Sequence, residues 1–174
     1  MLEEEIIIGC QQNSPKAQEE LYKRYSRKLQ GVVMLYIRSR EESKDILHEA
    51  FIKIYTGVKG FNFQGSFEGW MRRIVVNTTL SYLKGKKKLN FTGFDDSKEI
   101  PQEEGESEPT YPEFTKEKLF ELIYSIPDKY RIIFVLSSVE GLSHREIALQ
   151  LNITEEGSRT RLKRSKEMLR SLIA

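Results

Sequence analysis

The sequence predicts an all-α fold: two small helical domains, an N-terminal helical bundle and a C-terminal helix-turn-helix, joined by a flexible acidic linker. Apolar residues recur at steps of three and four over most of the chain, which is the period of a helix with one buried face. Capping residues stand directly before several of these runs. Residues 89–112 instead have little periodicity, three prolines and a run of glutamates, a composition typical of a disordered linker. We therefore expect domains over residues 1–88 and 113–174, with the linker between them.

Two helices are predicted in the N-terminal part. Ser14 and Pro15 form a cap and first-turn pair that opens a long amphipathic helix to about Ile37. Ser39 and Glu42 stand at capping-box spacing and open a second helix that ends near residue 58. The expected core face of the second helix comprises Leu47, Ala50, Phe51, Ile54 and Val58.

The opposite face of the second helix carries Asp45, His48, Glu49 and Ile52. A stripe that mixes acids with an outward-facing isoleucine suits a docking surface for another macromolecule. A solvated face with one stray apolar residue explains the stripe equally well, because single apolar residues are common on surfaces.

A loop rich in glycine follows and holds aromatic and amide side chains, namely Phe61, Asn62, Phe63 and Gln64. Aromatic rings next to a basic helix can stack on unpaired bases, and the amides can form hydrogen bonds with them. Core packing is the alternative, and it is the preferred interpretation for Phe67 and Trp70, which continue the apolar face of the next helix.

That next helix, expected over residues 67–85, is strongly basic. Residues 67–88 contain six basic residues and one acid, more than the capping of a helix C-terminus needs. The candidates for nucleic-acid contact in this region are Arg72, Arg73, Asn77, Lys84, Lys86 and Lys87.

Residues 142–172 are predicted to form a helix-turn-helix. Ser143 and Glu146 form a capping box at the start of its first helix. Asn152 tolerates the left-handed conformation that ends a helix, and Thr154 can cap the helix that follows. We expect further helices at about 113–124 and 127–139. Their side chains would support the motif through a small core of Ile123, Tyr130, Ile133, Phe134 and Ile147.

The second helix of this motif has a narrow buried face and a basic face beside it. The expected buried residues are Ser158, Leu162, Ser165, Leu169 and Leu172. A helix of this shape fits the DNA major groove, whereas the alternative is an ordinary helical hairpin with a solvated basic face. The candidate DNA-binding residues of the motif are Ser143, His144, Arg145, Glu155, Ser158, Arg159, Thr160, Arg161, Lys163, Arg164 and Lys166.

Charge is segregated along the chain although the net charge is only +2. The basic residues of 67–88 and of 142–174 are separated by residues 89–118, which hold nine acids and three bases. Two basic regions with an acidic spacer suggest two contacts with nucleic acid.

Several classes of protein are excluded by composition. Cys10 is the single cysteine, and His48 and His144 are the two histidines, so neither a disulfide framework nor a Cys/His metal site can be assembled. Phosphate-binding and nucleophile motifs are absent from the sequence. We expect no catalytic residue, cofactor or metal. The apolar run at residues 6–9 is too short and too acidic in its flank for an export signal, so we expect a cytoplasmic protein without membrane insertion.

With both parts considered, the chain resembles a bacterial RNA polymerase sigma factor of the extracytoplasmic-function (ECF) type. DILHEAFIKIY (residues 45–55) resembles the helix that such factors dock on the polymerase clamp. Residues 61–88 resemble the segment that melts and reads the promoter element nearest the start site, and residues 126–169 resemble the domain that reads the upstream element. The resemblance implies RNA polymerase core and promoter DNA as partners, and it leaves open whether an anti-sigma protein covers these surfaces.

The sequence departs from the family pattern at a few positions. His48 stands where glutamine is usual, Asn152 replaces the usual glycine of the turn, and Glu156-Gly157 occupies a place where glycine followed by threonine is common. Base preference therefore cannot be carried over. Two other functions would use the same helices: a helix-turn-helix regulator that binds DNA without polymerase, and a helical adaptor that does not bind DNA.

Overall fold

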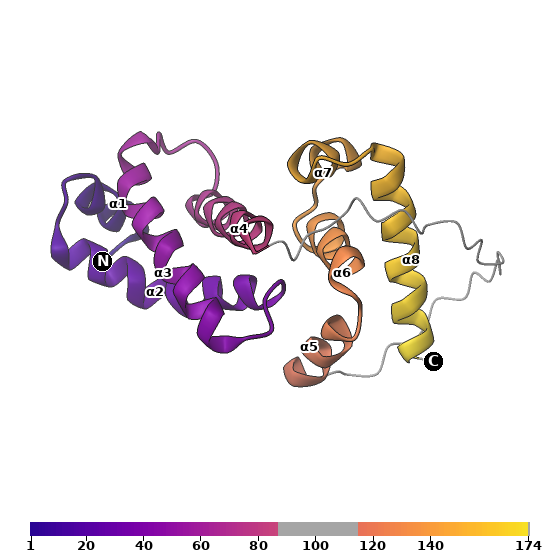
Figure 1. Ribbon diagram of the computed structural model, residues 1–174. Helices are drawn as coiled ribbons and strands as arrows, with labels where there is room; N and C mark the ends of the chain where they lie inside the picture. Colours follow the sequence, from indigo (N-terminus) through magenta and orange to yellow (C-terminus); the bar gives the residue numbers. More distant parts are fainter. Residues whose placement is uncertain (87–114, 174) are drawn as a thin grey trace. The chain divides into compact units, whose positions relative to one another are not determined.

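The computed structural model describes residues 1–86 and 115–173, and within these ranges all regular structure is helical (Figure 1). This confirms the predicted all-α fold. The chain divides into two compact units, Met1–Lys88 and Leu89–Ala174. The predicted linker at 89–112 and the candidate residue Lys87 lie outside the described residues.

The first unit contains α1 (Glu3–Gln11), α2 (Pro15–Met34), α3 (Arg40–Gly57), the short 3₁₀ helix η1 (Val58–Gly60) and α4 (Phe67–Gly85). The predicted caps are present: the Ser14 hydroxyl accepts a hydrogen bond from the amide of Ala17, and the Ser39 hydroxyl accepts one from Glu42. The helix α2 ends three residues earlier than expected because its last turn tightens, with the amides of Leu35 and Tyr36 bonded to carbonyls three residues back.

The helix α1 was not expected from the sequence. Its apolar residues are nearly consecutive and do not show a helical period. Its N-cap residue is Leu2, whose side chain cannot accept a hydrogen bond, so the carboxylate of Glu5 caps the helix by accepting the Leu2 amide at 2.7 Å. Ile6 and Ile7 are buried against the rest of the unit. Gly9 permits this packing, since a Cβ atom added there would lie 2.5 Å from the Cβ of Ala17 on α2.

The core of the first unit forms where α3 and α4 pack against each other and against α2. The predicted core face of α3 is confirmed: each of its five residues is at most 4% exposed. The helix α4 contributes Phe67, Met71 and Val75 to the same core, and its N-cap is Ser66, whose hydroxyl accepts the amide of Gly69. This packing turns the opposite face of α3 and one side of α4 outward.

The second unit contains α5 (Lys116–Tyr124), α6 (Asp128–Phe134), the π-helical turn η2 (Val135–Val139), α7 (His144–Leu151) and α8 (Glu155–Ile173). Its small core contains Ile123, Tyr130, Ile133 and Ile147 as predicted, whereas Phe134 is only half-buried. The last turn of the predicted 127–139 helix widens to the π form before Gly141, which has a φ of 70°.

The helix-turn-helix is formed by α7 and α8, as predicted. Both halves of the capping box are present: the Ser143 hydroxyl accepts the amide of Glu146 at 3.2 Å, and the Glu146 carboxylate accepts the amide of Ser143 at 2.8 Å. Asn152 ends α7 in the left-handed conformation (φ 54°), and the Thr154 hydroxyl accepts the amide of Gly157 at the start of α8. The buried residues of α8 extend only to Ser165, so Leu169 is half-buried and Leu172 is 48% exposed.

Candidate nucleic-acid and polymerase interfaces

The outer face of α8 presents a row of basic side chains. Arg159, Lys163 and Lys166 are exposed, and Thr160 lies beside them, half-buried. The guanidinium of Arg159 is 3.2 Å from the carboxylate of Glu155, one turn earlier. An exposed pair of this kind is worth only about 0.3–0.5 kcal/mol, so it can be exchanged for a phosphate or a base edge. Arg145 on α7 is also exposed.

Ser158 belongs to the packing between helices, which corrects its prediction as a DNA contact. It is fully buried, and its hydroxyl lies 2.8 Å from Nδ1 of His144 at the start of α7. Since serine is small, the two helices approach closely at this point. His144 is half-buried and is engaged in this hydrogen bond, so it positions the motif.

Arg161 is 7% exposed, which corrects its prediction as a DNA-binding residue. The helical period turns it toward the core, away from Arg159 and Lys163. Gly157 lies one turn earlier, where an added Cβ would approach Nη1 of Arg161 to 3.4 Å and the capping oxygen of Thr154 to 3.0 Å. Glycine at this position therefore leaves room for both groups.

Arg164 is half-buried and donates from Nη1 to the hydroxyl of Tyr130 at 3.3 Å. This hydrogen bond joins α8 to α6. Arg164 thus has a packing role besides its predicted contact with DNA.

In the first unit, the loop between η1 and α4 divides its aromatic residues between core and surface. Phe61 is 7% exposed, and its ring centroid lies 5.1 Å from that of Phe67 and 5.5 Å from that of Trp70. Its prediction as a stacking platform for bases is corrected, because its ring is buried in the aromatic cluster with Phe67 and Trp70. Phe63 is 47% exposed and packs on Phe61 at 5.6 Å.

The tip of this loop has an unusual backbone. Phe63 has a φ of 60°, rare for a non-glycine residue, and the amide of Gln64 donates to Oδ1 of Asn62 at 3.2 Å. Asn62 and Gln64 are exposed on either side of Phe63. This turn leaves the Phe63 ring about half exposed, packed on the buried ring of Phe61.

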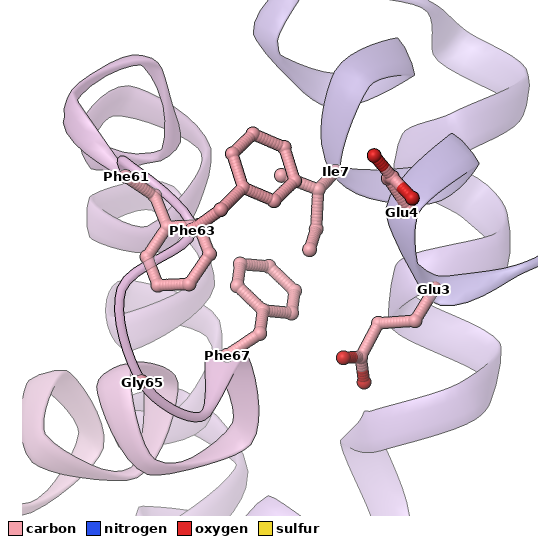
Figure 2. Close-up of a pocket in the computed structure, with 7 residues that line it drawn as sticks. All are labelled: Glu3, Glu4, Ile7, Phe61, Phe63, Gly65 and Phe67. Atoms are coloured by element: carbon pink, nitrogen blue, oxygen red, sulfur yellow. The ribbon is translucent and has the colours of Figure 1, made fainter.

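A cavity of about 360 Å³ lies between this loop and α1. Figure 2 shows side chains of α1 on one side of it and, on the other, aromatic side chains of the loop and of the first residue of α4. The lining residues are Glu3, Glu4, Ile7, Phe61, Phe63, Gly65 and Phe67. The hydroxyl of Tyr25 donates to the carboxylate of Glu3, and burial together with this bond raises the pKa of Tyr25 to about 12.

The other end of α1 fixes the loop directly. Nε2 of Gln11 donates to the carbonyl oxygens of Val58, at 3.1 Å, and Phe61, at 2.9 Å. Neither α1 nor this contact was predicted from the sequence. No local pattern signals a hydrogen bond between residues about fifty positions apart, so only the tertiary structure places Gln11 here.

The exposed side of α4 carries Arg73, Asn77 and Lys84, with Arg72 half-buried beside them, and the exposed Lys86 caps the end of the helix. Lys86 lies 3.3 Å from the Glu42 carboxylate of α3 and 5.0 Å from the ring centroid of Tyr82. Hydrogen bonds to Tyr82 and Glu42 raise the pKa of Lys86. Glu42 also accepts the hydroxyl of Tyr82 at 2.7 Å, so the predicted capping glutamate joins α3 to the basic end of α4.

The predicted docking stripe on α3 lies on the surface. Asp45, His48 and Glu49 are exposed, and Ile52 is 55% exposed. The carboxylate of Glu49 is 2.9 Å from Nζ of Lys53. Within the described ranges, no group of histidine, cysteine and acidic side chains could hold a metal ion, and no helix is long and apolar enough to cross a membrane.

Both units match models of known protein families. Residues 21–89 match the family model of Sigma-70 region 2, and residues 116–169 match that of Sigma-70, region 4. The chain is similar to the ECF RNA polymerase sigma-E factor of Haemophilus influenzae, at 26% identity over 99% of this chain and 96% of that protein. It is 28% identical to the ECF RNA polymerase sigma-E factor of Escherichia coli K12, over 94% and 90% of the two chains.

Among solved structures, the sigma factor RpoE of Bartonella quintana, in complex with the anti-sigma factor NepR, shares the fold. Its TM-score is 0.54 at 13% identity, over 88% of this chain and 94% of that one. The chain therefore belongs to the class of transcription initiation factors. It is a member of the sigma-70 family, an ECF-type sigma factor that directs promoter recognition by RNA polymerase.

Proposed function

We propose that this sigma factor binds polymerase core through the α3 stripe, reads the −35 element with α8, and reads and melts the −10 element with α4 and the loop before it. The observation that carries the proposal is the capped α7–α8 pair, which presents Arg159, Lys163 and Lys166 on one exposed face. The proposal leaves out Phe61, Ser158 and Arg161 as DNA contacts, because all three are buried.

At the upstream element, α8 would enter the major groove with Arg159, Thr160 and Lys163 facing the bases. An arginine can bind guanine through two parallel hydrogen bonds. Such a bidentate contact favours the correct base over a wrong one by about 1–3 kcal/mol. Lys166, farther along α8, and the exposed Arg145 of α7 would contact phosphates, which position the protein without reading sequence. The hydrogen bond between His144 and Ser158 would hold α7 and α8 at the angle that this docking needs.

At the downstream element, Phe63 would stack on an extruded base of the displaced strand, and Asn62 and Gln64 would form hydrogen bonds with base edges. Stacking on an aromatic ring is worth about 1–3 kcal/mol per base, which offsets the few kcal/mol needed to extrude it. The exposed basic side chains of α4, above all Arg73 and Lys84, would bind the adjacent phosphates of the DNA.

The stripe of Asp45, His48, Glu49 and Ile52 suits polymerase better than DNA, since phosphates would repel its carboxylates. We propose that the protein has no catalytic activity of its own and works in the cytoplasm beside polymerase. An anti-sigma factor is a further proposed partner, supported by the Bartonella quintana complex.

A two-step assay tests the proposal. Titration of the chain with polymerase core, followed by footprinting of promoter DNA with and without core, should give tight core binding and protection of both elements only in the complex. Protection of duplex DNA by the chain alone, with no affinity for core, would instead indicate a regulator that acts without polymerase. Core binding with no promoter protection would contradict the assignment of α8 and α4.

A further inference from the structure

A polar notch lies between α3 and α4, apart from the cavity beside α1. Its volume is about 270 Å³, and its lining residues are Lys53, Ile74, Asn77, Thr78 and Ser81. Residues 74, 77, 78 and 81 stand at steps of three, one and three, so they form a single face of α4. Lys53 closes the notch from α3.

The chemistry of this lining suits an anion. It offers one ammonium group, one amide and two hydroxyl groups around Ile74. The Thr78 hydroxyl already donates to the carbonyl of Ile74 at 2.8 Å, whereas the Ser81 side chain is exposed. Lysine is a common phosphate ligand as a point charge, and serine and asparagine side chains also bind phosphate oxygens.

The position of the notch identifies the anion. Asn77 belongs both to the notch and to the α4 surface that we assign to the downstream element. Lys53 lies next in sequence to Ile52 of the polymerase stripe and pairs with Glu49 of that stripe at 2.9 Å. Since the Lys53 side chain is 47% exposed, water and salt screen this pair, and a phosphate can replace the carboxylate.

We propose that the notch binds one backbone phosphate of the promoter strand, with Lys53 supplying the charge and Ser81 and Asn77 the hydrogen bonds. The DNA-binding surface of the first unit then extends from α4 onto α3 and meets the polymerase stripe there. The inference rests on the proposed function of α4, because it needs the downstream DNA to pass along that helix.

The test uses polymerase holoenzyme saturated with the full chain and a fork-junction promoter DNA whose downstream element is single-stranded. Binding is measured between about 50 and 200 mM salt for wild type, Lys53→Gln and Lys53→Arg. Each lost phosphate contact makes the fall of log K with log salt less steep, by about 0.7–0.9 in slope. The loss of DNA affinity caused by Lys53→Gln should therefore shrink about threefold as the salt concentration rises over this range. Lys53→Arg keeps the charge and should retain most of the affinity.

Lys23→Gln is the matched control. Lys23 is an exposed lysine of α2 that pairs with Glu19 one turn earlier, at 2.7 Å, in the same way as Lys53 pairs with Glu49. Its replacement removes the same charge and the same kind of ion pair at a place away from the notch, and should leave the salt slope unchanged. Single methylphosphonate substitutions along the DNA then locate the contact. At one position, the neutral methylphosphonate should weaken DNA binding by the wild type but cause no further loss of binding in Lys53→Gln.

Three outcomes would overturn the inference. A Lys53→Gln slope equal to wild type would show that no phosphate contact was lost. If Lys23→Gln lost as much DNA affinity as Lys53→Gln, the loss would be a general effect of charge. A defect confined to core binding, measured without DNA, would assign Lys53 to polymerase. Arg73→Gln, tested in parallel, separates these results from the proposed function: if it also binds normally, the assignment of α4 fails as well.

Discussion

Nδ1 of His144 lies 2.8 Å from Oγ of Ser158, and this hydrogen bond joins the first residue of α7 to the buried face of α8. Loss of one partner of such a bond costs about 0.5–1.5 kcal/mol, and more if the other is left unsatisfied. We therefore expect Ser158→Ala to lower the free energy of unfolding by about 1 kcal/mol. It should also weaken binding to the upstream element while core affinity stays unchanged. Urea denaturation and a −35 duplex titration measure the two effects; equal stability and affinity would show that the bond does not fix the motif.

The arginines at 159 and 161 should respond differently to replacement, although they are two residues apart. Arg159 is exposed, so Arg159→Ala should reduce promoter affinity by about 1–3 kcal/mol if it binds a base through two hydrogen bonds, with little loss of stability. Arg161 is 7% exposed, so Arg161→Ala should chiefly destabilise the second unit. Thermal unfolding and promoter titration of both variants check this. The reverse pattern would mean that α8 presents another face to DNA.

Replacement of Glu49 should affect polymerase binding. Glu49→Lys reverses a charge in the centre of the proposed stripe and should weaken core affinity in a direct titration. Glu19→Lys is the control, because Glu19 also forms an exposed ion pair with a lysine four residues later, but on α2. Similar core affinity for the two variants would place the polymerase contact elsewhere.

The side chain of Gln11 should matter for promoter melting. Gln11→Ala removes two hydrogen bonds to backbone carbonyls, at Val58 in η1 and at Phe61 in the loop, and so should loosen Phe63 and its neighbours. We expect slower opening of the −10 element, measured by permanganate reactivity of unpaired thymines, with core affinity retained. Gln12→Ala changes the adjacent exposed glutamine and serves as the control. Normal melting by Gln11→Ala would mean that the aromatic cluster alone positions the loop.

Two glycine-to-alanine changes should have opposite effects on stability. Gly9→Ala would place a Cβ atom 2.5 Å from that of Ala17 and should destabilise the first unit by about 1–3 kcal/mol through overpacking. Gly31→Ala, inside α2, meets no heavy atom within 4 Å and should stabilise by about 0.5–1 kcal/mol because alanine favours the helix. Denaturant midpoints measure both. A harmless Gly9→Ala would show that α1 can shift away from α2 at little cost.

The sequence alone determined those features that depend on neighbours along the chain. The caps at Ser14, Ser39 and Ser143, the left-handed Asn152 and the core face of α3 were predicted because each depends on hydrogen bonds or a helical period within one or two turns. The outward stripe on α3 and the basic row on α8 were predicted by the same period, which sets the face on which a side chain lies.

The tertiary structure alone decided which residues of a face are covered, because burial depends on segments distant in sequence. Phe61 and Phe63 look equivalent in the sequence, but the cluster with Phe67 and Trp70 covers the first and leaves the second exposed. The helix α1, anchored through Gly9 and Gln11, gained its place from contacts with α2 and with η1. Arg161 is buried where Arg159 is exposed because α8 packs on α6 and α7, and that packing is a property of three helices together.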